Sequence, residues 1–271
     1  MQLTIEQRQR YEEQGFLLVP DVFTAAEVEL LRDESVAIFR HQRPEIWREK
    51  NGAPRTAFGC QRYSDLFSAL TADARLYDPV AQIFGEGLYV HQFKVNPKVA
   101  FDGDPFPWHQ DYATWHPDDG MPEPRAMNIA IFLDDVTSAN GALMFVPGSQ
   151  KLGEIEAPDV NGRRWTERKD VERIIRSQDD IAVAEGTAGS VLLFHGNVLH
   201  GSAGNITPLA RRILYVTYSA ASNTLVNPTR AEFIAHQDFT PVVRDERPFG
   251  QRTGRADTAN AAEFEPAVYA A

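Results

Sequence analysis

The chain contains, at residues 106–116, the stretch Phe106-Pro107-Trp108-His109-Gln110-Asp111-Tyr112-Ala113-Thr114-Trp115-His116. At its centre, His109-x-Asp111 offers an imidazole and a carboxylate two residues apart. Residues 107–115 are predicted to form a β-strand, on which alternate side chains share a face. His109 and Asp111 would then point the same way and could bind one metal ion. The pair is common by chance, so this prediction depends on a third ligand.

His200 is the best candidate for that third ligand. It follows an apolar, strand-like run and is followed by Gly201 and Ser202, which favour a turn before the next strand. Its competitor His195 is more typical of a structural histidine. Two imidazoles and one carboxylate, with open positions on one face of the ion, form the facial triad of non-haem Fe(II) oxygenases. Those open positions let a co-substrate and dioxygen bind side by side.

Arg211 lies eleven residues beyond His200 and begins the run Arg-Arg-Ile-Leu-Tyr-Val-Thr-Tyr-Ser. Alternation on a strand places Arg211, Ile213 and Tyr215 on one face. A guanidinium at the end of an apolar face is suited to bind a carboxylate through two hydrogen bonds. The distal carboxylate of a 2-oxo acid needs such a partner, and Ser202 could add a hydroxyl.

The chain on either side of these motifs predicts a mainly β fold with some α-helix. Residues 1–87 are predicted to be mainly helical, with helices at 5–14, 25–40, 66–70 and 75–84 and a surface loop at 42–57. Residues 88–219 carry short strand-like runs between turn residues. We therefore expect a double-stranded β-helix, a jelly-roll or cupin-like core, with the N-terminal helices packed on one sheet. Residues 1–271 would form a single domain.

Two segments lie outside this pattern. The charge-rich insertion at residues 153–180 could be a lid over a pocket or an ordinary surface helix. Residues 220–271 form a C-terminal extension in which we find no clear pattern.

Charge and composition narrow the class of protein. A formal net charge of −11 argues against nucleic acid or an anionic membrane surface as the main partner. The chain has one cysteine, and neither a signal-peptide core nor an apolar run of membrane-spanning length. We predict a cytoplasmic protein with a small-molecule substrate; the sequence does not indicate its oligomeric state.

The motifs together resemble the phytanoyl-CoA dioxygenase family of Fe(II)/2-oxoglutarate-dependent oxygenases. The resemblance covers residues 4–219 and includes Asn-Gly-Ala-Leu-Met-Phe-Val-Pro-Gly-Ser at 140–149. It is strongest to the ectoine-hydroxylase-like branch, which acts on small, polar, amino-acid-like molecules. The resemblance implies that Fe(II) is bound by His109, Asp111 and His200, and 2-oxoglutarate by Arg211, Ser202 and Asn96. It also implies a substrate pocket that includes Gln92, Phe106, Trp115 and Tyr215. Arg125 could bind a substrate carboxylate, or it could form an ion pair at the protein surface.

The function implied is hydroxylation of a free L-amino acid or a derivative, using O2 and decarboxylating 2-oxoglutarate to succinate and CO2. Asp111 favours hydroxylation, because related halogenases have a small residue at that position. The other pocket residues differ from the ectoine-specific set, so ectoine itself is not expected. Two alternatives stay open: a tailoring oxygenase for a larger natural product, and a non-catalytic jelly-roll protein that binds a metal or ligand.

Overall fold

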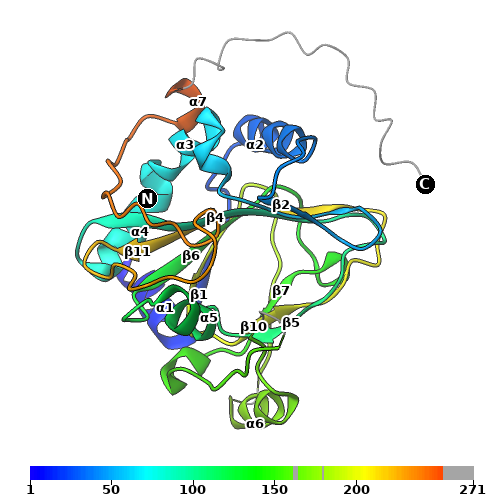
Figure 1. Ribbon diagram of the computed structural model, residues 1–271, viewed down its shortest axis with the longest axis vertical. Helices are drawn as coiled ribbons and strands as arrows, with labels where there is room; N and C mark the ends of the chain where they lie inside the picture. The colour runs from blue at the N-terminus through cyan, green and yellow to red at the C-terminus, as the bar shows by residue number, and fades with distance from the viewer. Residues whose placement is uncertain (161–163, 179, 253–271) are drawn as a thin grey trace.

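Two antiparallel sheets form the body of the protein (Figure 1). The structure is a computed structural model that describes residues 1–160, 164–178 and 180–252. The large sheet has the order β1 (Phe16–Val19), β9 (Val191–His195), β6 (Ala126–Phe132), β11 (Arg211–Ala220), β4 (Leu88–Lys98), β3 (Pro54–Phe58) and β2 (Ile46–Arg48). The small sheet has the order β5 (Phe106–His109), β10 (His200–Ser202), β7 (Leu143–Phe145) and β8 (Ala182–Ala184). This is the jelly-roll architecture expected from the sequence.

The central strand β11 shows why the sheets stack. Its Leu214 and Val216 pack in the core shared with the helices, whereas Ile213 and Tyr215 pack in the core that includes Phe145 of the small sheet. Alternate side chains of one strand therefore enter two different cores, as a period of two requires. Arg211 shares the Ile213 and Tyr215 face, so it points into the space between the sheets.

Four helices precede the first long strand: α1 (Ile5–Gln14), α2 (Ala25–Ile38), α3 (Asp65–Thr71) and α4 (Ala74–Phe84). Both α1 and α2 begin with a capping box, in which the threonine hydroxyl and the side chain three residues later each bind the other's backbone N–H. Leu31, Leu70 and Val80 are fully buried in the core that includes the large sheet's apolar face. The prediction of N-terminal helices packed on one sheet is confirmed.

Two local predictions were wrong. The segment at 42–57 is not a loop, because it contains β2 and most of β3, which extend the large sheet. The strand expected at 107–115 ends at His109, and the helix α5 (Tyr112–Asp119) follows. Asp111 has helical backbone angles, and its carbonyl accepts from the backbone N–H of Trp115. The aromatic residues that favoured a strand are equally able to pack one face of a short helix.

The segment after β11 returns across the large sheet. The backbone N–H of His236 donates to the carbonyl of His91, and the side chain of Gln92 donates to the carbonyl of Ile234. The chain then reaches α7 (Phe249–Arg252), where Phe249 is buried in the helix-side core. These contacts place residues 234–236 against β4. The expected C-terminal extension therefore builds part of the fold as far as residue 252; residues 253–271 lie outside the described part.

The insertion at 153–180 contains α6 (Arg168–Gln178), and its residues 161–163 and 179 are outside the described part. No helix in the described ranges is long and apolar enough to cross a membrane.

Candidate metal centre and adjoining pockets

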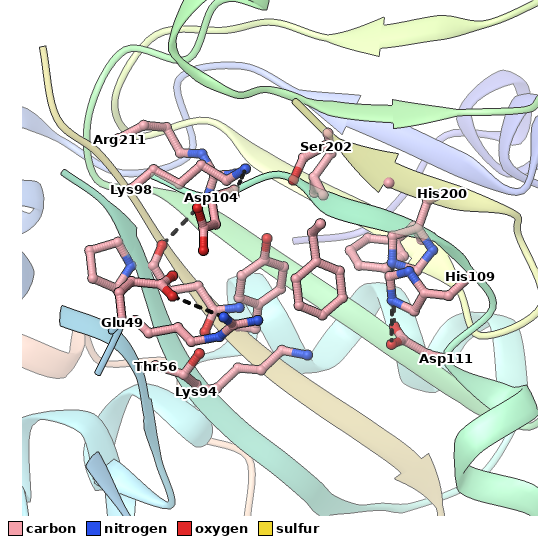
Figure 2. Close-up of a pocket in the computed structure, with 18 residues that line it drawn as sticks. Glu49, Thr56, Lys94, Lys98, Asp104, His109, Asp111, His200, Ser202 and Arg211 are labelled. Carbon is pink, nitrogen blue, oxygen red and sulfur yellow. Dashed lines mark hydrogen bonds and ion pairs between the residues drawn. The ribbon is translucent and has the colours of Figure 1, made fainter. Parts of the chain in front are cut away.

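The three predicted ligands lie together between the sheets. His109 ends β5 and His200 begins β10, and the two residues are paired directly across these strands. Asp111 lies in the turn before α5. One ligand atom from each residue can be chosen so that all three lie within 4.8 Å of one another, and all three residues are buried. Figure 2 shows both imidazoles facing the carboxylate.

Hydrogen bonds fix the orientation of both imidazoles. Nδ1 of His109 lies 2.9 Å from the carbonyl oxygen of Pro107, and Nδ1 of His200 lies 3.0 Å from that of Val198. A carbonyl only accepts, so each Nδ1 carries the hydrogen and each Nε2 presents a lone pair. The Nε2 atoms lie 3.5 and 3.8 Å from the Asp111 carboxylate oxygens. Both lone pairs therefore converge on the same point as the carboxylate.

The protonation states also suit a metal ion. Burial and the neighbouring His109 lower the pKa of His200 to about 3, so its imidazole is neutral. Burial alone would raise the pKa of Asp111, but the positive charge of Lys94 and the facing imidazole of His109 outweigh it and hold that pKa below its usual value. Neutral imidazoles and an ionised carboxylate are the forms that bind divalent iron. The three residues fit the metal that the sequence implies.

Two neighbouring amides hold the ligand-bearing turn in place. The side-chain amide of Asn128 on β6 donates to Asp111 at 2.7 Å, while its oxygen accepts from the Thr217 hydroxyl on β11. Gln110, between the two ligands, donates to the carbonyls of Gly153 and Asn197 and accepts from the N–H of Ile155. The turn, rather than strand alternation, brings His109 and Asp111 together. Gln110 also ties that turn to the base of the insertion.

One adjoining cavity, which we call the Arg211 pocket, contains the residues expected to bind 2-oxoglutarate. Arg211, Ser202, Asn96 and Tyr215 all line it together with the three candidate ligands. The Arg211 guanidinium is buried and donates to the carbonyl of Gly141 through Nε and Nη2, at 3.0 and 2.6 Å. Figure 2 shows Arg211 at one end of the pocket, the triad at the other end and Ser202 between them. This arrangement suits a ligand that binds metal at one end and a cation at the other.

A second cavity, the Arg230 pocket, has a volume of about 350 Å³ and borders two of the three candidate ligands, His109 and Asp111. Gln92, Phe106 and Trp115 line it, as the resemblance implies for a substrate pocket. Trp115 is almost fully buried on α5, with its ring edge-on to His91, so it supplies a wall rather than an exposed surface. Tyr215, which was expected here too, lines the Arg211 pocket instead.

Arg125 does not reach either pocket. Its guanidinium pairs with Glu86 at 2.6 Å and donates to the carbonyl of Phe84 and the hydroxyl of Ser222. It follows that the surface ion pair, one of the two alternatives considered for Arg125, is the one found. We leave Arg125 out of the candidate substrate site.

Sequence reasoning did not assign a role to several residues that the fold brings here. Lys94 lines both pockets and lies on the same β4 face as Gln92 and Asn96, so the period of two already placed it there. Arg230 lies in the extension that showed no pattern, and Trp165 in the insertion. Trp165 packs edge-on against His109 and Phe106. The insertion therefore forms one wall of the pocket; its movement as a lid stays a prediction.

Comparison with protein families gives a match that covers most of the chain. The model of the phytanoyl-CoA dioxygenase (PhyH) family matches residues 11–213. The chain belongs to the phytanoyl-CoA dioxygenase family. Two relatives illustrate its place there. L-proline trans-4-hydroxylase of Streptomyces griseoviridis is 37% identical over 88% of this chain and 95% of its own length. The ectoine dioxygenase of Stutzerimonas stutzeri is 36% identical over 89% of this chain and 86% of its own length.

Solved structures agree with this assignment. EctD from S. alaskensis, crystallised with 2-oxoglutarate and 5-hydroxyectoine, has a TM-score of 0.82 and 29% identity over 91% of this chain and 89% of that one. The same protein with bound Fe has a TM-score of 0.81 and 30% identity over the same shares. Family and fold thus agree with the resemblance found in the sequence.

Proposed function

We propose that this member of the phytanoyl-CoA dioxygenase family is an Fe(II)- and 2-oxoglutarate-dependent hydroxylase of a free L-amino acid. The observation that carries the proposal is the position of His109 and Asp111, which border two adjoining cavities, one lined by Arg211 and the other by Arg230. One cavity would receive the co-substrate and the other the molecule to be hydroxylated. L-proline is the first substrate to test, because a relative that covers nearly the whole chain is named for it.

In this proposal, His109 and His200 would hold Fe(II) through Nε2, and Asp111 through a carboxylate oxygen. When bound, the iron with 2-oxoglutarate and O2 supplies the oxidising power that breaks a substrate C–H bond, and 2-oxoglutarate becomes succinate and CO2. The contribution of the protein is positioning and exclusion of water. Asn128 fixes the carboxylate, and Trp165 with Phe106 covers the outer face of His109.

The Arg211 pocket is the proposed site for 2-oxoglutarate. Arg211, with Ser202 and Asn96, would bind the distal carboxylate, and the keto-acid end would reach the triad. Lys94 lies between the two ends, with its ammonium 5.1 Å from the centre of the Tyr215 ring. No described residue hydrogen-bonds to that ammonium, so it is available to an anionic ligand.

The Arg230 pocket is the proposed site for the amino acid. Nε and Nη2 of Arg230 form a two-point ion pair with Asp119, at 2.6 Å for the first. Asp119 is fully buried and fixes the guanidinium, whereas Nη1 has no hydrogen-bond partner among the described residues. A guanidinium held in this way is suited to bind the substrate carboxylate. Gln92 in the same pocket offers an amide oxygen for the ammonium group.

The size of this pocket favours a small substrate over a larger natural product. Ligand pockets in proteins typically span roughly 300–1,000 Å³, and the Arg230 pocket, at about 350 Å³, is near the lower limit. Its lining combines cationic, amide and aromatic groups, as a zwitterion with an aliphatic body requires.

The decisive experiment is a panel of the common L-amino acids with Fe(II), ascorbate, 2-oxoglutarate and O2. We expect succinate to form in proportion to a product 16 mass units heavier for one or a few of them, with L-proline tested first and L-prolinamide as its control. Anaerobic Fe(II) with 2-oxoglutarate should also give a weak visible absorption band. Absence of the band and of succinate above background across the panel would overturn the proposed function. Turnover restricted to larger compounds would instead favour the tailoring oxygenase.

Exchange of Arg230 for lysine is expected to raise the KM for the amino acid about tenfold, since a charge-assisted hydrogen bond contributes roughly 1.5 kcal/mol. Lysine preserves a positive charge beside buried Asp119 but loses the second guanidinium edge. The dissociation constant of 2-oxoglutarate, measured by the visible band, should stay unchanged. In the wild type, replacing the substrate carboxylate by an amide should raise the KM at least tenfold. In Arg230→Lys the same replacement should raise the KM by a smaller factor. An unchanged amide penalty would show that Arg230 does not bind the carboxylate.

A further inference from the structure

We propose that Lys98 is a second cationic anchor for the distal carboxylate of 2-oxoglutarate, beside Arg211. This inference rests on the proposed function, because it assumes that the dicarboxylic acid binds in the Arg211 pocket. It adds a second residue of β4 to a site that the sequence predicted from Ser202 on β10, Arg211 on β11 and Asn96 on β4. It also predicts a pH dependence that Arg211 alone would not produce.

The fold places the two cations side by side. Lys98 ends β4 and Arg211 begins β11, and the two residues are direct partners in the antiparallel pairing of these strands. Both line the Arg211 pocket, and both are buried. In Figure 2 the side chains of Lys98 and Arg211 lie close together, with Ser202 beyond them toward the triad. A carboxylate that reaches Arg211 would therefore also lie beside the Lys98 ammonium.

The Lys98 side chain is held in this position by backbone groups. Its ammonium donates to the carbonyl of Asp104 at 2.9 Å and to the carbonyl of Ala203. Gly141 is required for this packing, because a Cβ there would lie 2.7 Å from Cδ of Lys98. The carbonyl of the same glycine fixes Arg211. The Asn140-Gly141 turn thus positions both cations at once.

Neither cation has a carboxylate partner in the described part of the chain. The hydrogen bonds of Lys98 and Arg211 end on neutral backbone carbonyls, and an ammonium has three N–H groups of which two are used. Two buried like charges without a counter-charge in direct contact are unfavourable. A bound carboxylate between them would supply that counter-charge, which is the physical reason to expect one.

The environment of Lys98 makes its charge sensitive to pH near neutrality. Burial and the positive charge of Arg211 lower the pKa of Lys98 to about 7, while Asp104 and Glu49 oppose the shift and Arg55 adds to it. A carboxylate bound at its ammonium would raise that pKa. Binding would then take up a proton wherever the pH lies between the free and the bound pKa. Affinity for 2-oxoglutarate should therefore be greatest below pH 7 and fall as the pH rises, by up to about tenfold per pH unit.

The test is the dissociation constant of 2-oxoglutarate for the full-length Fe(II) protein, measured anaerobically by the visible band from pH 6 to 8.5. The probe for comparison is 2-oxopentanoate, which has the same keto-acid end but no distal carboxylate. We expect 2-oxoglutarate to lose affinity above pH 7 by more than 2-oxopentanoate does. Titration of the metal ligands would affect the affinity for both probes equally. The difference between their pH dependences therefore reports on the surroundings of the distal carboxylate.

Two variants make the assignment specific to Lys98. Lys98→Arg keeps a charge at every pH, and is expected to remove the excess pH dependence while it retains affinity. Lys98→Met is expected to weaken 2-oxoglutarate at pH 6 by roughly 10- to 100-fold, the usual effect of a lost charge-assisted hydrogen bond, and to leave 2-oxopentanoate unchanged. Thermal melting reports whether each variant is folded, and the wild-type comparison of the two probes stands if Lys98→Met is not.

The outcomes separate this inference from the proposed function. If the band forms with 2-oxoglutarate but its pH dependence matches that of 2-oxopentanoate, Lys98 is not an anchor and the proposed function stands. The same conclusion follows if folded Lys98→Met binds 2-oxoglutarate normally. If no band forms at any pH, the proposed function fails, and the role of Lys98 fails with it.

Discussion

Exchange of Asp111 for alanine is expected to lower hydroxylation by more than about 100-fold. Mutation of a residue one step removed from a metal typically costs roughly 10- to 100-fold in affinity or activity, and a ligand itself should cost more. Asp111 is the only carboxylate in the described three-residue cluster, so its loss leaves two imidazoles and no anionic ligand. Fe(II) affinity and product formation should therefore fall together.

The matched control is Glu172→Ala, which removes a carboxylate from the exposed face of α6. It should leave iron content, the visible band and succinate formation at wild-type values. Asp111→Ala also leaves the buried amide N–H of Asn128 without its acceptor, which should lower the free energy of unfolding by about 1–3 kcal/mol. Bound iron, measured after desalting, and thermal melting separate the two effects. Wild-type iron binding by Asp111→Ala would show that the ligands are misassigned.

The chemistry of the site could be predicted from the sequence better than its geometry. His109, Asp111 and His200 were selected for their residue types, and these three do lie within bonding reach of one point. The reason given for the first pair was wrong, because Asp111 lies in a turn and not on a strand. Asn128 on β6 and the carbonyl of Gly196, which accepts from the N–H of Tyr112, fix that turn through contacts with distant parts of the chain. A local pattern holds no information about such contacts.

Arg211 illustrates the opposite case. Alternation along β11 was sufficient to place it on the face of Ile213 and Tyr215, and the structure has it in the pocket between the sheets. A strand that is buried on both sides keeps a strict period of two, since a slip by one residue would move every side chain into the other core. Predictions of this kind succeed where packing leaves the strand no alternative.

The positions of Arg230 and Trp165 cannot be predicted from strand alternation. Each reaches the pocket from a segment without regular periodicity, held by contacts to distant residues such as Asp119 for Arg230 and the carbonyl of Trp108 for residue 166. Walls of substrate pockets are commonly built from such segments. For that reason the candidate metal ligands and Arg211 could be predicted from the sequence, whereas Arg230 and Trp165 in the wall of the substrate pocket could not. Substrate choice is the part of the function that depends most on the structure.

Exchange of Arg211 for methionine is expected to raise the dissociation constant of 2-oxoglutarate roughly 30- to 4,000-fold, since truncation of one partner of a buried charge pair costs about 2–5 kcal/mol. Methionine fills similar space but cannot bind a carboxylate. Binding of Fe(II) alone should persist, because Arg211 is not among the candidate ligands. The KM for 2-oxoglutarate should rise accordingly, and excess co-substrate should restore part of the turnover.

The adjacent residue provides the control for this prediction. Arg212 faces the other side of β11 and pairs with Asp134 through Nε and Nη2, at 2.8 and 2.7 Å. Arg212→Met therefore removes an arginine from the same strand without changing the pocket, and it should reduce stability but not 2-oxoglutarate affinity. In a jelly-roll protein that only binds a metal, neither Arg211→Met nor Arg212→Met would change the affinity for its ligand. Equal 2-oxoglutarate affinity in both variants and the wild type would thus contradict the assigned co-substrate site, whereas loss in Arg211→Met alone distinguishes an oxygenase from a simple metal-binding protein.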